Sequence, residues 1–170
     1  MNTNKLNSVP LFIDLEASGF GRGSYPIEVG VADENQKVMS LLIKPEDHWT
    51  HWDEGAAEIH GISRDVLMKA GISAKDVALS LNEKFIGKIL YSDGWSFDSS
   101  WLGLLYNDVG IFQRFKLETV TKILTQAQLE IWDKTKKEIG DAMNHTRHRA
   151  SVDAKILQQT YIKTLEITSK

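Results

Sequence analysis

The sequence predicts a mixed α/β fold, and three observations lead to this prediction. Three short apolar segments follow one another closely near the N-terminus, at residues 11–17, 27–32 and 38–43. Segments with helical spacing of apolar residues then alternate with two further strand-like runs. Two longer helical patterns occupy the last third of the chain. Strands followed by alternating helices and strands are typical of a sheet that helices cover.

The first three strands are expected to form an antiparallel meander. Pro10 precedes the apolar run 11–17, and the glycine-rich segment 18–24 after it indicates a turn or loop. The second and third strands are joined around Asn35-Gln36, which is short enough for a hairpin connection.

The rest of the chain is expected to be mostly helical. Ser63 is a suitable N-cap for one of the short helices. Apolar spacing predicts helices at 54–59, 63–70, 73–85, 97–106, 126–139 and 150–165, a fourth strand at 89–92 and a short fifth strand near 115–117.

The composition is that of an ordinary soluble domain. The chain has 170 residues, of which 42% are hydrophobic and 25% charged, and this suits one domain spanning residues 1–170. It contains no cysteine, which excludes disulfides and thiolate metal sites. The first ten residues have no apolar run of signal-peptide length, and no stretch approaches the ~20 apolar residues of a membrane span. We therefore expect a cytoplasmic protein without a membrane partner.

The net charge limits how the protein can bind nucleic acid. A value of −3 argues against a protein that coats long nucleic acid by charge alone. A carboxylate cluster that binds divalent cations would nevertheless make one site locally positive. A solvated acidic surface accounts for the net charge equally well.

Asp14 and Glu16 are the first candidates for chemistry. Residues two apart on a strand project from the same face, so these carboxylates lie roughly 6.6 Å apart by the strand rise. Leu11, Ile13 and Leu15 then point the other way, into the core. A half-exposed strand would give the same alternation. A strand this apolar usually pairs near the centre of a sheet, however, where two carboxylates on one face need a function.

Two further acids and a histidine occur later in the chain. Asp98 lies at the beginning of an expected helix, where an acid also interacts favourably with the helix dipole. His148 precedes Asp153 by five residues. The two can converge only if His148 lies in the loop before the last helix, because five residues on one helix turn through about 500°. The same spacing recurs elsewhere in the chain, so it carries little weight alone.

The order of these pieces resembles the DEDDh group of 3′–5′ exonucleases, relatives of ribonuclease T, oligoribonuclease and proofreading exonuclease subunits. The matching segments run in family order over nearly the whole chain: Phe12–Phe20, Pro26–Gly30, Ile59–Ser63, Ser96–Leu102 and His148–Ala154. The resemblance implies a ribonuclease-H-like five-stranded mixed sheet, with three antiparallel strands followed by parallel additions, flanked by helices. Asp14 and Glu16 would lie on its central strand.

The resemblance also implies a mechanism. Two Mg²⁺ or Mn²⁺ ions would be held by Asp14, Glu16, Asp98 and Asp153, with Asp14 as the bridging ligand. His148 would act as general base on the attacking water, since an imidazole can accept a proton at neutral pH. The substrate would be a single-stranded RNA or DNA 3′ end, released as nucleoside monophosphates.

The expected substrate contacts lie next to the catalytic strand. Ala17, Ser18 and Phe20 follow Asp14 and Glu16 directly, and Phe20 is the best candidate for stacking on a base, although core packing is its ordinary alternative. His60 resembles the family segment that borders the terminal nucleotide, although a histidine at a helix boundary needs no such role. Relatives of this kind often form homodimers, but the sequence shows no interface signature.

Two features leave the substrate open. The family usually has an asparagine four residues before the third acid, and Gly94 holds that position here. The substrate subclass is therefore not determined by the resemblance. Arg147, Arg149 and Lys155 could contact phosphates, or they could form a solvated basic face.

Two other classes of function remain. A non-catalytic nucleic-acid-binding or adaptor domain on the same scaffold would normally have lost at least one acid, and none is missing here. In a structural or interaction module, the acids would be solvent-exposed surface residues without a chemical role. The central position expected of Asp14 argues against this class. Because fold alone does not establish function, the exonuclease hypothesis depends on the five site residues.

Overall fold

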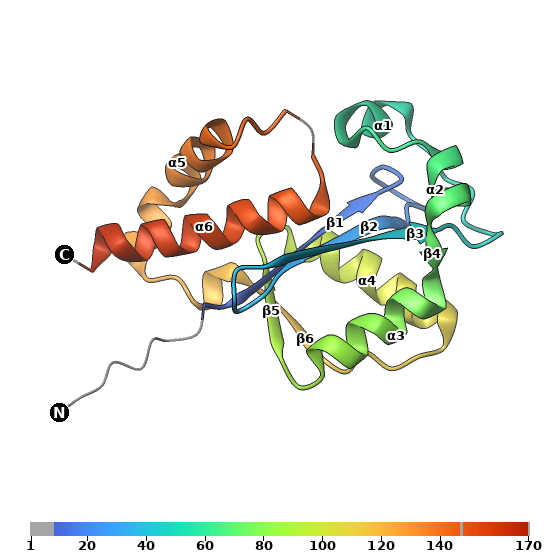
Figure 1. The fold of residues 1–170 in the computed structure, drawn as a ribbon, viewed down its shortest axis with the longest axis horizontal. Helices are drawn as coiled ribbons and strands as arrows, with labels where there is room; N and C mark the ends of the chain where they lie inside the picture. Colours follow the sequence, from blue (N-terminus) through green and yellow to red (C-terminus); the bar gives the residue numbers. More distant parts are fainter. Residues whose placement is uncertain (1–8, 147, 170) are drawn as a thin grey trace.

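The computed structural model describes residues 9–146 and 148–169 (Figure 1). The six strands are β1 (Leu11–Ala17), β2 (Pro26–Ala32), β3 (Val38–Lys44), β4 (Ile72–Ser73), β5 (Ile89–Ser92) and β6 (Lys116–Thr119). The helices are α1 (Glu54–His60), α2 (Arg64–Ala70), α3 (Ala74–Phe85), α4 (Trp95–Val109), α5 (Gln126–Ala142) and α6 (Ala150–Thr168), with a 3₁₀ turn η1 (Val120–Lys122).

The strands form one mixed sheet in the order β4-β3-β2-β1-β5-β6. β1, β2 and β3 are antiparallel, whereas β5 pairs in parallel with β1 and β6 pairs in parallel with β5. β1 is therefore central, and its carboxyl end lies beside the carboxyl end of β5. Open sheets commonly bind ligands at such an edge.

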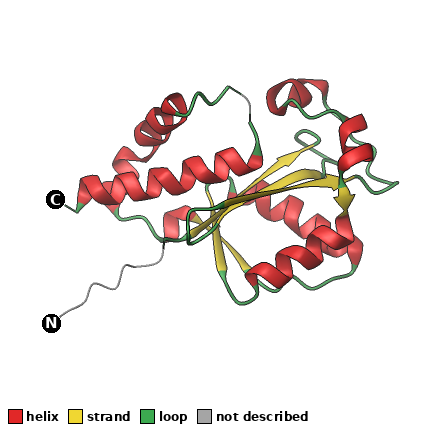
Figure 2. Cartoon of the chain, viewed as in Figure 1, coloured by secondary structure: helices red, strands yellow, loops and turns green. Residues whose placement is uncertain are grey.

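Helices cover both faces of the sheet. In Figures 1 and 2, α3 and α4 lie on one side of the strands, while α6, with α5 beside it, crosses the other side. All seven residues of β2 are buried, as expected for a strand covered on both faces. The two layers give the molecule two apolar clusters, one on each face of the sheet.

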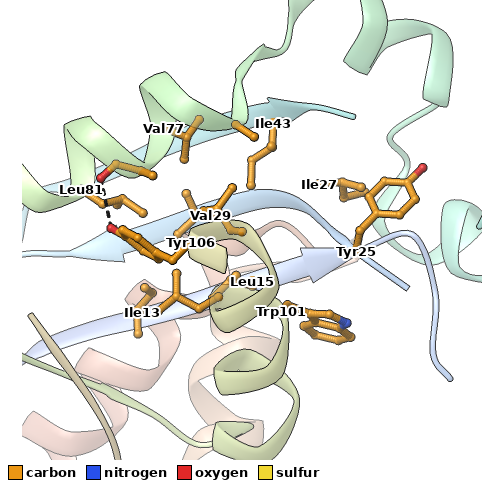
Figure 3. Packing of buried hydrophobic residues seen from close by; sticks show 14 of the residues in the cluster. Ile13, Leu15, Tyr25, Ile27, Val29, Ile43, Val77, Leu81, Trp101 and Tyr106 are labelled. Carbon is orange, nitrogen blue, oxygen red and sulfur yellow. Dashed lines mark hydrogen bonds between the residues drawn. The ribbon is translucent and has the colours of Figure 1, made fainter. Parts of the chain in front are cut away.

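The larger cluster lies between the sheet and helices α3 and α4 (Figure 3). Ile13 and Leu15 point into it, as the alternation along β1 predicts. The hydroxyl group of Tyr106 in α4 hydrogen-bonds the carbonyl of Ala78 in α3 at 3.1 Å, which joins these two helices. Phe12 points to the opposite face and packs with residues of α5 and α6. The face of β1 that carries Asp14 is therefore the face that α6 covers.

Helix α6 begins unusually close to β2. A Cβ atom on Gly30 would lie 2.1 Å from the backbone carbon of Ala150 and 2.2 Å from the nitrogen of Ser151. Only glycine leaves room for this approach. Because Gly30 is paired with Asp14 across the β1–β2 ladder, the contact brings the first turn of α6 next to Asp14.

The sequence-based prediction of the fold is confirmed, with one correction. All five expected strands are present within two residues of their expected bounds, and Ser63 is the N-cap of α2. The sixth strand, β4, was missed because it has two residues and no apolar pattern of its own. Ser73, expected inside a helix, ends β4 and caps α3. Within the described residues, none of the helices is long and apolar enough to span a membrane.

Candidate active site

The acids predicted from the sequence meet at the carboxyl end of β1. Asp14 and Glu16 lie on β1, and a bulge follows between Glu16 and Ala17. Asp153 lies in the first turns of α6, and each of these three residues places a carboxylate oxygen within 4.8 Å of the others. They come from two segments far apart in the sequence, which the contact between α6 and β2 brings together.

Asp98 borders the same cleft as Asp14 and raises its pKa. It lies in the first turn of α4 and is almost fully buried, and its carboxylate accepts a hydrogen bond from the hydroxyl of Ser92 at the end of β5. Gly94 caps α4 without a side chain and borders the same cleft as Asp14 and Asp98. The parallel pairing of β5 with β1 thus places the third acid beside the first.

The acids raise one another's pKa values. Burial, and then the charges of Asp98, Asp153 and Glu16, raise the pKa of Asp14 well above its ordinary value. Burial and the charge of Asp153 raise the pKa of Glu16 to about 8. Burial also raises the pKa of Asp98 to about 7, although the Ser92 hydrogen bond acts in the other direction. Partly buried carboxylates in such a group favour a bound cation, which removes their repulsion.

The donor atoms of this group fit a divalent metal ion. Carboxylate oxygens are the ligands that hard cations such as Mg²⁺ and Mn²⁺ accept. Asp14, Glu16 and Asp153 converge closely enough for one ion to contact an oxygen of each. The acidic residues at this edge could therefore hold a metal.

A buried ion pair fixes the beginning of α6. Glu28 on β2 is fully buried, and its carboxylate accepts hydrogen bonds from the Arg149 guanidinium, from the Ala150 amide at 3.1 Å and from the Ser40 hydroxyl at 2.6 Å. Burial alone would raise the pKa of Glu28, but these hydrogen bonds outweigh it and lower the pKa below its ordinary value. Glu28 stays ionised and holds the α6 N-terminus against the sheet. This role of Glu28 was not predicted from the sequence.

His148 lies in the loop before α6, as the spacing to Asp153 requires. Its ring is more than half exposed, and its Nδ1 lies 3.4 Å from Oδ2 of Asp153. Its backbone amide donates to the carbonyl of Ile59 in α1 at 3.3 Å, which ties the loop to the far side of the cleft. The side chain is thus held near the acids while remaining open to water.

A second histidine at the site was missed. Nε2 of His145 lies 3.0 Å from Oδ1 of Asp153, and the His145 and His148 rings pack edge to face with centroids 4.8 Å apart. His145 has no regular spacing to the other site residues. A turn at Asn144, which has a positive φ of 51°, folds its side chain back toward α6, and only the structure reveals that turn.

Two clefts meet at Asp14 and His148. One, of about 310 Å³, is mostly apolar and is bordered by Leu15, Phe20, Ile59, Phe97 and Trp101 besides the acids. The other, of about 440 Å³, is bordered by α5 and α6 and contains Asp93, Asp133 and Lys136. Lys136 is ion-paired with Asp93 within it. The catalytic candidates thus stand between an apolar and a charged cleft.

Three aromatic rings, of which Phe20 and Phe97 are exposed and Trp101 is buried, form a wall of the apolar cleft. Phe20 packs edge to face on Phe97 with centroids 5.1 Å apart, and Phe97 stacks on Trp101 at 5.7 Å. Phe20 and Phe97 remain 63% and 52% exposed, so their faces are open to a ligand. Phe97 was not predicted as a stacking residue, although its spacing of four to Trp101 on a helix predicts a shared face.

Three of the four expected substrate contacts border the apolar cleft. Ala17, Phe20 and His60 do so. His60 is buried, its Nδ1 accepts from the amide of Ile62 at 3.1 Å, and its Nε2 has no hydrogen-bond partner among the described residues. Ser18 is placed differently. It is fully buried, and its hydroxyl bonds His51 at 2.9 Å, so its side chain stabilises the loop after β1 and does not border the cleft.

The basic stretch near α6 is engaged in the fold. Arg149 is paired with Glu28, and Lys155 donates to the carbonyl of Gln36 at 2.8 Å. Arg147, the third residue of that stretch, lies outside the described residues. Arg149 and Lys155 therefore have structural partners in the fold.

Solved structures of exonucleases have the same fold. A moderately thermophilic exonuclease I from Methylocaldum szegediense matches with a TM-score of 0.70 and 13% sequence identity, over 94% of this chain and 41% of that one. E. coli exonuclease I in complex with a dA16 oligonucleotide matches with a TM-score of 0.69 and 14% identity, over 92% and 40%. The zinc-bound form of the E. coli exonuclease I–ssDNA complex matches with a TM-score of 0.64 and 13% identity, over 94% and 40%.

These likenesses establish the fold as ribonuclease-H-like, of the kind found in exonucleases. The chain spans about two fifths of the length of the exonuclease chains it matches. Neither a comparison with protein-family models nor one with curated proteins finds a match.

Proposed function

We propose that the protein is a divalent-cation-dependent 3′–5′ exonuclease of the DEDDh group, acting on single-stranded nucleic acid. The observation that carries the proposal is the meeting of Asp14, Glu16, Asp98, His148 and Asp153 at the carboxyl end of the central strand. These residues come from three separate segments, and chance surface acids would not converge at one buried edge. The fold shared with exonuclease I structures supports the same activity.

The carboxylates would hold two Mg²⁺ or Mn²⁺ ions. Asp14 is the natural shared ligand, because its carboxylate lies within 4.8 Å of those of Glu16 and Asp153 and its pKa is also raised by the nearby charge of Asp98. When bound, such ions supply Lewis-acid stabilisation of the charge that develops on a phosphoryl group during in-line displacement. The raised pKa values of Asp14, Glu16 and Asp98 support this assignment, because the acids are poorly compensated by other protein groups.

His148 would take the proton from the attacking water. It lies where the two clefts meet, and its exposed ring can pass the proton to solvent. Asp153 would orient the imidazole through the side facing Nδ1, which leaves Nε2 as the accepting atom. The ion pair between Glu28 and Arg149 would act indirectly, by holding the loop before α6 and the first turn of α6 in position beside β1.

The apolar cleft would bind the terminal nucleoside. The exposed faces of Phe20 and Phe97 suit stacking on a base, and stacking of this kind tolerates any sequence. A base must leave its duplex partner to stack on such exposed rings, so the cleft favours single-stranded ends. E. coli exonuclease I is seen with single-stranded oligodeoxynucleotides, which makes single-stranded DNA the first substrate to test, with RNA beside it.

The adaptor alternative is less well supported. A nucleic-acid-binding domain without activity has no need of a complete cation-binding set, and here every acid is present and assembled. The two possibilities differ in cation binding and in product formation.

Polarity and product identity test the proposal. A single-stranded DNA labelled at its 5′ end should shorten by single nucleotides in Mn²⁺ and release nucleoside 5′-monophosphates. The same strand with a phosphorothioate at its last 3′ linkage should resist shortening, while one modified at the first 5′ linkage should be degraded normally. Internal cleavage, or protection by the 5′ modification alone, would count against a 3′–5′ exonuclease.

A further inference from the structure

Two imidazoles converge on one carboxylate beside the proposed catalytic set. Nε2 of His145 lies 3.0 Å from Oδ1 of Asp153, and Nδ1 of His148 lies 3.4 Å from Oδ2 of the same residue. One donor atom from each of the three residues lies within 4.8 Å of the others. His145 has no part in the proposed reaction, so its presence at Asp153 calls for a separate explanation.

The side chain of His145 is placed by the fold. Its backbone amide donates to the carbonyl of Gly140 at the end of α5, at 3.0 Å, after the turn at Asn144. Its side chain is only 15% exposed. Its Nε2 is buried and has no geometrically acceptable hydrogen-bond partner in the described part of the chain, although Asp153 lies nearby. A buried nitrogen left in this state costs free energy unless a ligand uses it.

We propose that His145, His148 and Asp153 form a second binding site, which overlaps the catalytic set, for a nitrogen-preferring divalent cation of the Zn²⁺ class. In a tetrahedral site with bonds of about 2.0–2.1 Å, neighbouring ligand atoms lie roughly 3.3–3.4 Å apart. The two nitrogens lie 3.0 and 3.4 Å from different oxygens of the Asp153 carboxylate, and one ligand atom from each of the three residues lies within 4.8 Å of the others, so small side-chain rotations would bring them to this spacing. Two imidazoles and one carboxylate suit Zn²⁺ and similar ions better than Mg²⁺. The charged cleft, which all three residues border, leaves a fourth position open to water.

The site shares residues with the proposed catalytic set. Asp153 also contributes to the group with Asp14 and Glu16, and His148 is the proposed base. A Zn²⁺-class ion between the histidines would therefore withdraw both groups from the reaction. This consequence rests on the proposed function: Zn²⁺ inhibits hydrolysis supported by Mg²⁺, and His145 determines the sensitivity.

Direct binding of Zn²⁺ tests the site without reference to activity. The whole chain is titrated with Zn²⁺ against a chromophoric chelator, in the wild type and in three variants. Asp14→Asn removes the proposed catalytic ligand and should keep Zn²⁺ binding. His145→Gln should weaken it by at least about tenfold. His48→Gln alters an exposed histidine that pairs with Asp108 and should change nothing.

Co²⁺ provides a second readout that needs no variant. Bound to the wild type, it should give the strong visible absorption of a four-coordinate ion with nitrogen ligands, in place of the weak spectrum of a six-coordinate ion with oxygen ligands. Wild-type Zn²⁺ affinity in His145→Gln, loss of affinity in Asp14→Asn, or a six-coordinate Co²⁺ spectrum would each overturn the proposal.

The outcomes separate this site from the proposed function. If Zn²⁺ binds through His145 but the protein hydrolyses no nucleic acid, the cation site stands and the exonuclease proposal fails. If hydrolysis occurs and Zn²⁺ inhibits the His145→Gln variant as strongly as the wild type, the exonuclease proposal stands and the site fails.

Discussion

The carboxyl groups of the site repel one another in the folded chain. Asp14 has several neighbours of the same charge, and its pKa is raised by burial and by Asp98, Asp153 and Glu16. The two lysines that border the charged cleft are already paired, Lys136 with Asp93 and Lys137 with Asp141. Like charges held together in a partly buried edge destabilise the fold, and sites of this kind commonly exchange stability for function.

Replacing Asp14 should therefore separate stability from activity. In the absence of divalent cations, Asp14→Asn should raise the free energy of unfolding by about 0.5–2 kcal/mol, because one repelling group is removed. The same variant should lose Mn²⁺ binding and hydrolysis. Chemical denaturation in EDTA and calorimetric titration with Mn²⁺ measure the two effects. The control is Asp47→Asn, at an exposed position that borders neither cleft, and it should change neither the stability nor Mn²⁺ binding. If Asp14→Asn were less stable than the wild type, charge repulsion at Asp14 would be contradicted.

The two histidines that border the apolar cleft should have different kinetic roles. His148→Ala should lower kcat by about 10²–10⁴-fold, the usual effect of losing a general base, without loss of Mn²⁺ binding. His60→Asn should mainly raise KM, because the buried Nε2 of His60 faces the cleft and has no partner among the described residues. Steady-state kinetics on a short oligonucleotide give both values. A larger loss of kcat in His60→Asn than in His148→Ala would show that His148 is not the general base.

At the scale of elements, the contact between α6 and β2 positions the site. Gly30 lets the first turn of α6 approach the sheet, and Glu28 binds the Arg149 side chain and the Ala150 amide. Both contacts lie within one turn of Asp153. Small displacements of the α6 N-terminus would move Asp153 away from Asp14 and Glu16.

Gly30→Ala tests this positioning. The added Cβ would lie 2.1 Å from backbone of α6, which cannot move aside as a flexible side chain can. We expect a loss of at least about 1–3 kcal/mol in stability, as for overpacked cores, together with weaker Mn²⁺ binding. Gly103→Ala is the matched control, because a Cβ at that helical position meets nothing within 4 Å. It should stabilise α4 by about 0.5–1 kcal/mol and leave Mn²⁺ affinity unchanged.

Most elements could be predicted because their apolar periodicity reflects one buried face. β1 was predicted with its observed bounds, since Ile13 and Leu15 alternate with Asp14 and Glu16. β4 could not be predicted, because two residues carry no period and its pairing depends on β3. The helix at Asp98 begins two residues earlier than expected, since Gly94 caps it without a polar side chain.

At the scale of the whole molecule, convergence of distant segments decides which residues belong to the site. The four acids and the histidine could be named from their order along the chain. Glu28 and His145 could not, because their roles depend on how α6 and the α5–α6 loop fold back on the sheet. Ser18 lies next to β1 in sequence, and the sequence could not show that its side chain is buried and bonded to His51.

The raised pKa values make global stability depend on pH and on divalent cations. Burial raises the pKa of Glu16 to about 8 and that of Asp98 to about 7, whereas unfolded acids titrate near ~4. Between these values the folded state holds more protons than the unfolded state, so the free energy of unfolding falls as pH rises. In EDTA, Tm should decrease from about pH 5.5 to about pH 8, after which the acids are ionised in both states.

Divalent cations should reverse this trend, because they bind the ionised acids of the folded state. Mn²⁺ should raise Tm more at about pH 8 than at about pH 5.5, and Asp14→Asn should lose most of that difference. Thermal unfolding followed by circular dichroism gives all the values needed. An equal effect of Mn²⁺ at both pH values would show that the ion does not compete with protons at these acids.

The central claim is that the edge of β1 is a cation-dependent exonuclease site, and a timed digest tests it most directly. Single-stranded DNA and RNA oligonucleotides labelled at the 5′ end are incubated with Mn²⁺ and the wild-type protein, beside Asp14→Asn. We predict a ladder that shortens from the 3′ end with the wild type and no change with the variant. No shortening of either strand by a protein that binds no Mn²⁺, or equal shortening by both proteins, would contradict the account.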